Sequence, residues 1–294
     1  MTMTTTSTQL RLAPNTAKRD DVRFHLARLL SWIVATLVAF GSAAGLWIDA
    51  LYRDGNAVAA MWRGYDLVSL IVVAPLLAVM LLRIRRSLRA RLVWLGLLGF
   101  VVYDYSLYVF GARFNDVFLI HIAILSSSIV AFVFALAGLD VDEIRRRVPV
   151  RRVRWVGSVL MVLALSLGAM WVVGSLRFVV TGELPDEPSK LVVPTSLTHL
   201  GWALDLALLV PAYALAGIML WRRSAWGIVL GTTLTVAGVL QQATYMTALV
   251  FQSNADVPGA AAFDPQEPFI AGAYVVAAGA LLLATPKENA RRPA

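Results

Sequence analysis

The 294-residue sequence contains no cysteine, which excludes disulfide exchange, thiolate metal sites and a cysteine nucleophile. Charge is also scarce, because Asp, Glu, Lys and Arg make up only 15% of the residues, against about a quarter in soluble domains. Lysine is nearly absent, with 3 residues beside 23 arginines, and together with abundant Ala, Val and Leu this bias indicates a bacterial genome rich in G and C. The composition is therefore not that of an ordinary soluble domain.

Long apolar stretches replace the missing charge. Hydrophobic residues make up 59% of the chain, and its mean hydropathy is +0.72. Repeated apolar runs of about 20 residues are long enough to cross a bilayer as helices. The sequence therefore predicts an all-α, polytopic helical membrane protein whose main partner is the lipid bilayer. The pI of about 10.2 then reflects charged loops and does not indicate binding to nucleic acid.

The apolar runs predict eight transmembrane helices. They cover about residues 29–49, 66–83, 92–111, 117–138, 155–178, 200–220, 226–251 and 268–285. We therefore expect a transmembrane domain over 28–285, a largely disordered cytoplasmic segment over 1–27 and a cytoplasmic tail over 286–294. Because the first apolar run is a full-length span, no cleavable signal peptide is expected.

Basic residues are concentrated on one side of these spans. Of the 26 Lys and Arg residues, 21 lie in the N-terminal segment, in alternate loops or in the C-terminal tail, whereas 12 of the 18 acidic residues lie on the opposite side. Loops rich in Lys and Arg stay in the cytoplasm. The asymmetry therefore predicts a protein of the inner (plasma) membrane with both termini in the cytoplasm.

Spans 2 and 6 carry similar features in the same order. Each begins with Asp-Leu, at Asp66 and Asp205, contains a proline, Pro75 or Pro211, and ends in Arg-Arg-Ser. These features suggest a parallel 4+4 duplication, in which two four-helix halves are related by an axis along the membrane normal. Transmembrane helices also converge on such features independently, so both interpretations stay open.

The polar residues of the predicted spans gather in the outer half of the bundle, around a hairpin formed by residues 101–128. Lipid cannot satisfy polar or ionisable groups, so such residues indicate a functional site by default. The candidates for proton transfer or catalysis are Asp104, Asp205, His121 and His199. The candidate ligand-binding residues are Asp66, Tyr103, Tyr105, Tyr108, Arg113, Asn115, Gln241, Gln242 and Tyr245.

Many of these residues also have a structural interpretation. Asp66 is explained equally well as a solvated helix end, and the tyrosines as part of an aromatic belt at the membrane interface. His121 alone is more often a hydrogen-bonded packing residue than a ligand. Asp104 and Asp205 are the hardest to explain by packing alone.

Histidines and carboxylates can bind zinc or iron, but the sequence has no HExxH or His-x3-His spacing. The eight-span layout with an outer site resembles that of haem A synthase, which has a histidine in spans 2, 4, 6 and 8. This chain departs from that pattern, because only its predicted spans 4 and 6 contain a histidine. We therefore predict no cofactor, with haem and zinc as the weaker alternatives.

The segment Tyr103-x-Tyr105-x-x-Tyr108-x-Phe110-Gly111-x-x-Phe114-Asn115 is similar to one in a family of uncharacterised eight-span integral membrane proteins of actinobacteria and related bacteria. The Asp-Leu pair at Asp66 and the segment from His199 to Pro211 resemble other marks of that family. The resemblance covers nearly the whole chain. It implies a topology and the position of a site, and it carries no activity.

Together these observations predict a polar pocket in the outer leaflet half that binds a small molecule or a lipid headgroup. One alternative is a proton-coupled small-molecule transporter. Others are a membrane-embedded enzyme acting on a lipid-type substrate and a scaffold subunit. A one-sided site suits an enzyme, whereas a transporter needs access from both sides of the membrane, so the sequence leaves the choice open.

Overall fold

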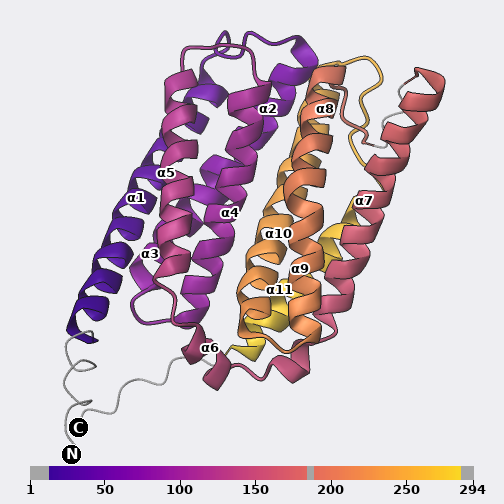
Figure 1. The fold of residues 1–294 in the computed structure, drawn as a ribbon. Helices are drawn as coiled ribbons and strands as arrows, with labels where there is room; N and C mark the ends of the chain where they lie inside the picture. The colour runs from indigo at the N-terminus through magenta and orange to yellow at the C-terminus, as the bar shows by residue number, and fades with distance from the viewer. Residues whose placement is uncertain (1–12, 184–188, 286–294) are drawn as a thin grey trace, which may run out of the picture.

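The computed structural model describes residues 13–183 and 189–285, with side chains from residue 22 onward. This part of the chain is helical and contains no strand. Eight of its helical stretches are long and apolar enough to cross a membrane (Figure 1). The predicted all-α class and the eight membrane-spanning helices are therefore confirmed.

Each half of the chain contributes four spans. The first four are α1 (Ala13–Trp47), the compound helix α2, η1 and α3 (Asn56–Val68, Ser69–Val73 and Ala74–Arg83), α4 (Leu88–Gly111) and α5 (Phe118–Ala137). The last four are α7 (Val156–Thr181), the compound helix α8, η3 and α9 (Thr195–Leu204, Asp205–Leu209 and Val210–Trp221), α10 (Ala225–Asn254) and α11 (Glu267–Ala284). A short helix α6 (Val141–Arg147) and the 3-10 turn η2 (Val150–Val153) connect the two halves.

Two predicted boundaries need correction. Helix α1 begins at Ala13, so the predicted disordered segment 1–27 is helical from that residue on, while residues 1–12 and the tail 286–294 lie outside the described residues. Helix α2 begins at Asn56, well before the expected start near residue 66. Arg63 of this helix donates a hydrogen bond to Asp49 at 3.2 Å. Asp66 consequently lies inside the span and is not a solvated helix end.

The loops give the bundle two different ends. The loops 48–55, 112–117 and 255–266 contain acidic residues and lie at one end, which we call the acidic end. The loops 84–87, 138–155 and 222–224 lie at the other, which we call the arginine-rich end. Two helices at the arginine-rich end begin with side-chain caps, because Ser87 accepts a hydrogen bond from the Ala90 amide and Asp140 from the Glu143 amide.

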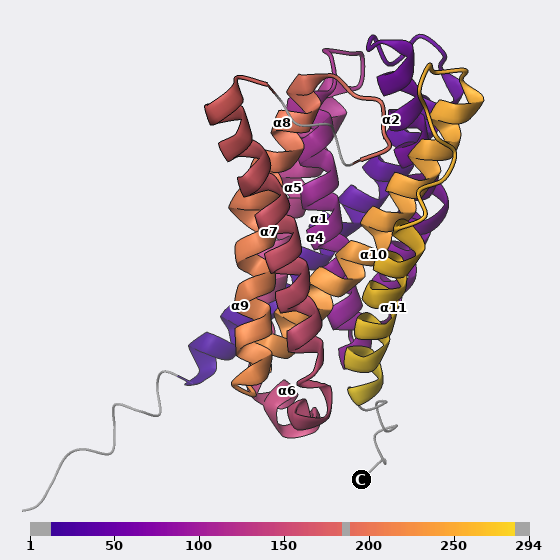
Figure 2. The same ribbon diagram turned by 90° about the vertical axis from the view of Figure 1, so that its right-hand side faces the viewer.

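The eight spans form two four-helix groups that lie side by side (Figures 1 and 2). In the first group α5 packs along both α1 and α4, which closes a ring of four helices. In the second group α9 packs on α7 and α10, and α10 packs on α11, but α7 and α11 contact each other little. Helix α10 also packs on α2 and α4 and so joins the groups. The first ring is closed, and the second is more open.

Both compound helices contain a π-helical turn followed by proline. Turn η1 ends two residues before Pro75, and turn η3 ends two residues before Pro211. A proline removes a backbone donor and crowds the carbonyl four residues earlier, and the π turn accommodates this change. Aligned on the prolines, Asp205 corresponds to Ser69, and Trp202 takes the place of Asp66. The two Asp-Leu pairs therefore do not correspond in structure, and the duplication remains a hypothesis that rests on the prolines and π turns.

Candidate functional site

Most of the predicted polar residues fall into two places, and the first is a buried cluster inside the first helix ring, which we call the sealed cluster. Asp66 is 1% exposed, and its carboxylate accepts hydrogen bonds from the Tyr52 hydroxyl at 2.5 Å and the Tyr108 hydroxyl at 3.1 Å. Gly45 of α1 faces this carboxylate so closely that a Cβ added there would collide with Asp66 and with the Tyr52 hydroxyl. The aspartate therefore connects α2, α4 and the loop after α1.

Aromatic rings fill the space around this aspartate. The Tyr108 ring stacks on Trp62 with 4.6 Å between ring centroids and on Tyr105 with 5.2 Å, and the His121 ring lies 4.8 Å from it. Trp62, Tyr105, Tyr108 and His121 are all buried. These rings pack directly against one another. The cluster is a close-packed core with a hydrogen-bonded carboxylate at its centre.

Asp104 lies in the same ring of helices and is fully buried. Neither of its carboxylate oxygens has a hydrogen-bond partner among the described residues, and neither does Nδ1 of His121. A buried polar group without a partner costs about 1–3 kcal/mol, and more if it is charged. The contacts within the described part of the chain therefore do not explain why an aspartate occupies this position.

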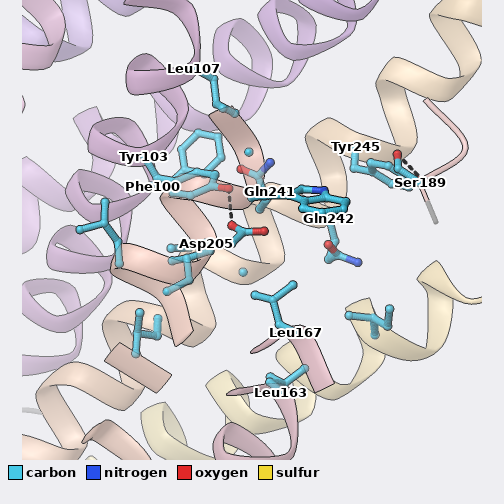
Figure 3. A pocket seen from close by; sticks show the side chains of 18 of the residues that line it. Phe100, Tyr103, Leu107, Leu163, Leu167, Ser189, Asp205, Gln241, Gln242 and Tyr245 are labelled. Carbon is cyan, nitrogen blue, oxygen red and sulfur yellow. Dashed lines mark hydrogen bonds between the residues drawn. The ribbon is translucent and has the colours of Figure 1, made fainter. Parts of the chain in front are cut away.

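The second place is a cavity of about 650 Å³ between the two helix groups (Figure 3). Its apolar wall is formed by side chains of α4 and α7, among them Phe100, Leu107, Leu163 and Leu167. Polar side chains line the part nearer the acidic end. They are Tyr103, Ser189, Asp205, Gln241, Gln242, Tyr245, Asp264, Gln266 and Glu267.

Asp205, the first residue of η3, bridges two walls of this cavity. Its Oδ1 accepts a hydrogen bond from the Tyr103 hydroxyl of α4 at 2.7 Å (Figure 3). Its Oδ2 accepts one from Trp171 Nε1 of α7 at 2.9 Å. The Trp171 ring stacks on Trp202 with 4.6 Å between centroids. Both aromatic donors are neutral, so the carboxylate has no basic partner among the described residues.

Residues 189–194, which precede α8, form a loop at the acidic end of the cavity, and hydrogen bonds hold this loop in place. The Tyr245 hydroxyl accepts a bond from the Lys190 amide at 2.9 Å and donates one to Asp264 at 3.3 Å. Gln252 is fully buried, and its side chain bonds to both the N–H and the C=O of Val192, each at 2.9 Å. Its Nε2 also donates to the carbonyl of Ala57 at 2.8 Å. Gln252 therefore ties this loop to α10 and α2.

The charge of the cavity is one-sided. Of the lining residues that the structure describes, three are acidic, namely Asp205, Asp264 and Glu267, and none is Lys, Arg or His. Glu267 accepts a hydrogen bond from the side-chain amide of Gln242, so its partner is also neutral. Lys190, which follows the lining residue Ser189, has an exposed side chain outside the lining. The described cavity therefore presents carboxylates without matching cations.

The structure divides the predicted site residues into three sets. Tyr103, Asp205, Gln241, Gln242 and Tyr245 line the cavity. Asp66, Asp104, Tyr105, Tyr108 and His121 belong to the sealed cluster and do not line it. Arg113, Asn115 and His199 lie outside both. The single pocket expected from the sequence is therefore not formed.

The residues of the third set do not line the cavity. Arg113 and Asn115 make hydrogen bonds in the loops at the acidic end. Asn115 closes a turn, since its side chain accepts a hydrogen bond from the Val117 amide and donates one to the Arg113 carbonyl, both at 3.1 Å. The Arg113 amide donates to the Asp54 carboxylate at 3.2 Å. Partial burial raises the pKa of Asp54, and the hydrogen bond from Arg113 opposes this shift. His199 is exposed on α8.

The cavity also contains residues that the sequence did not single out as site residues, among them two tryptophans and two acids. They are Trp171, Trp202, Asp264 and Glu267. The sequence offered a partial signal for the two acids, because they end an acidic loop rich in Pro and Gly. It offered none for the pairing of the two tryptophans, because they lie in different spans.

The described side chains contain no group of three or more His, Cys, Asp or Glu residues that could hold a metal ion. Comparison with protein-family models, curated proteins and solved structures finds no match for this chain. The function must therefore be argued from the geometry of the cavity itself.

Proposed function

We propose that this chain is a protein of a bacterial inner (plasma) membrane, with its arginine-rich end and both termini in the cytoplasm. The eight apolar helices support membrane insertion, and the concentration of arginine at one end of the bundle supports the orientation. In this orientation the acidic end faces outward. The polar part of the cavity then lies in the outer leaflet half.

We further propose that the protein binds a small molecule or a lipid headgroup in this cavity. The observation that carries the proposal is the cavity itself, whose 650 Å³ falls within the range of about 300–1,000 Å³ that is usual for ligand sites. Mostly apolar walls and a few convergent polar groups are also typical of such sites. Asp66, Tyr105, Tyr108 and His121 are buried in the first helix ring and do not line this cavity.

Native mass spectrometry of the protein purified in mild detergent tests this proposal. Gly201 lines the cavity, and a Cβ added there meets open space, so we expect the ring of Gly201→Phe to occupy part of the cavity. Gly272 of α11 is a matched control, because it also meets open space but does not line the cavity. We expect a bound species of defined mass on the wild type and on Gly272→Phe, and its loss from Gly201→Phe. Equal occupancy of all three proteins would contradict the proposal.

A proton-coupled transporter is the second candidate function, and one observation favours it. Asp205 lies in η3, where the helix departs from regular α geometry beside the cavity. Irregular turns in membrane helices often accompany binding sites that change conformation. Uptake of the identified ligand into proteoliposomes, with and without a proton gradient, separates a transporter from a protein that only binds.

A further inference from the structure

We propose that the cavity selects a hydrophobic organic cation, an amine or quaternary ammonium group attached to an apolar body. The proposal rests on the proposed binding function and narrows it to one class of ligand. A lipid with an amine headgroup and a free hydrophobic amine share this chemistry.

The first argument comes from the partners of the acidic residues. Elsewhere in the described chain, four acids pair with arginine: Asp116 with Arg53 at 2.8 Å, Asp49 with Arg63 at 3.2 Å, Glu143 with Arg147 at 3.3 Å and Asp140 with Arg146 at 3.6 Å. The three acids of the cavity have no such partner among the described residues and are bonded only to neutral donors. A bound cation would supply the missing charge, and its attraction to carboxylates is strong where water is excluded.

The second argument comes from the aromatic rings beside Asp205. Trp171 and Trp202 stack on each other, and Trp171 donates to the same carboxylate that Tyr103 contacts from the opposite wall. An indole or phenol face attracts a cation within about 6 Å of the ring centroid by about 0.5–2 kcal/mol. Aromatic rings next to a carboxylate are how proteins bind alkylammonium groups, which cannot donate many hydrogen bonds. Both elements are present at this position.

The third argument comes from polar atoms in the lining that lack a partner. Thr233 of α10 is 5% exposed and lines the cavity, yet its hydroxyl has no hydrogen-bond partner in the described structure. Other hydroxyls in the spans, such as Thr235 and Thr247, bond back to the carbonyl four residues earlier. Trp202 also lines the cavity, and its buried Nε1 has no hydrogen-bond partner in the described structure. The acids are therefore not the only polar groups of the lining that lack a matching partner.

The test compares a cation with a neutral molecule of the same shape. The probes are 4-phenylbutyl-trimethylammonium and its isostere in which carbon replaces nitrogen. Binding is measured by equilibrium dialysis to the full chain in phosphatidylglycerol nanodiscs, which contain no amine headgroup, and binding to empty nanodiscs is subtracted. We expect the cation to bind at least about tenfold more tightly than the isostere, a difference of about 1.4 kcal/mol.

Two carboxylate variants locate the charge selectivity. Asp205→Asn and Glu267→Gln should each reduce the preference for the cation several-fold, whereas Asp116→Asn, which removes a surface acid paired with Arg53, should leave it unchanged. Glu267→Gln keeps the test valid if Asp205→Asn unfolds the protein, because Glu267 has a single side-chain partner. Gly201→Phe should abolish binding of both probes.

The outcomes separate this proposal from the one it rests on. Equal binding of both probes, or no saturable binding of the cation, overturns the choice of a cation, while a native ligand lost on Gly201→Phe still supports a binding site. Replacing half of the phosphatidylglycerol with phosphatidylethanolamine then distinguishes the sources. A weaker apparent affinity of the probe indicates that the lipid headgroup competes for the cavity, and an unchanged affinity indicates a free amine.

Discussion

Asp66 and Asp205 make similar hydrogen bonds in very different surroundings. Each lies in the second span of its helix group, and each carboxylate accepts two bonds from neutral aromatic side chains. Asp66 is enclosed by packed rings and a glycine, whereas Asp205 borders an open cavity. The hydrogen-bond partners of an aspartate inside a membrane span therefore do not distinguish a packed site from a cavity site, whereas the packing around the carboxylate does.

The difference between the two aspartates follows from the closure of the helix rings. Helices α1 and α5 pack along each other and close the first ring, so the side chains inside it pack closely. Helices α7 and α11 contact each other little, so the second ring cannot fill its interior with its own side chains. Asp205 also lies within its π turn, whereas Asp66 precedes η1 and lies in regular α-helix.

The largest effect should come from adding one methyl group to the sealed ring. Gly45→Ala forces a Cβ against the Asp66 carboxylate and the Tyr52 hydroxyl, and overpacking of this kind costs about 1–3 kcal/mol. Gly41→Ala is the control on the same helix, because its Cβ would meet Ile120 at an ordinary 3.7 Å. Thermal unfolding in detergent should show a lower midpoint for Gly45→Ala only. Similar midpoints would mean that the ring around Asp66 is not closely packed.

An intermediate effect should separate the two aspartates directly. Tyr108→Phe removes one hydrogen bond from a sealed carboxylate, which should destabilise the protein by about 1–2 kcal/mol and leave ligand binding unchanged. Tyr103→Phe removes the corresponding bond from Asp205, where the cavity leaves room for a replacement partner. We expect it to affect ligand affinity more than stability. If both variants lose the same stability and neither changes binding, the two sites do not differ as described.

The smallest effect should appear at the loop that covers the sealed ring. Because partial burial raises the pKa of Asp54, the folded protein binds this proton more tightly than the unfolded chain does. The contribution favours folding at low pH and is lost as pH rises from the ordinary value of 3.8 through the raised one. After solvent screening it should not exceed about 0.5 kcal/mol. Asp54→Asn should remove this pH dependence from the thermal midpoint, and an unaltered pH profile would contradict the assignment.

The sequence was sufficient for the helices of this fold. Apolar runs of about 20 residues have few alternatives to a transmembrane helix, so each of the eight predicted spans corresponds to a helix long and apolar enough to cross a membrane. The early start of α2 was missed because Arg63 and Gly64 interrupt the apolar pattern. Arg63 donates hydrogen bonds to Asp49, a contact between segments that the local sequence does not reveal.

The predicted site residues are divided between the cavity and the sealed cluster by the rotation of each helix about its own axis. Sequence spacing defines this rotation poorly. Tyr103 and Tyr105 are two residues apart on α4, and one faces the cavity while the other faces the sealed ring. Both look alike in a list of polar residues ordered by depth. The choice between them depends on where α10 packs against α4, and that contact joins segments far apart in the chain.

Gln252 holds the loop of residues 189–194 in an unusual way. Its side-chain amide gives Val192 one acceptor and one donor, the pattern by which two residues pair across a β-ladder. A side chain thus imitates a strand neighbour, and the loop is held as though it were part of a two-residue sheet. The position of this loop is therefore set in part by a residue of α10, through hydrogen bonds to the loop backbone.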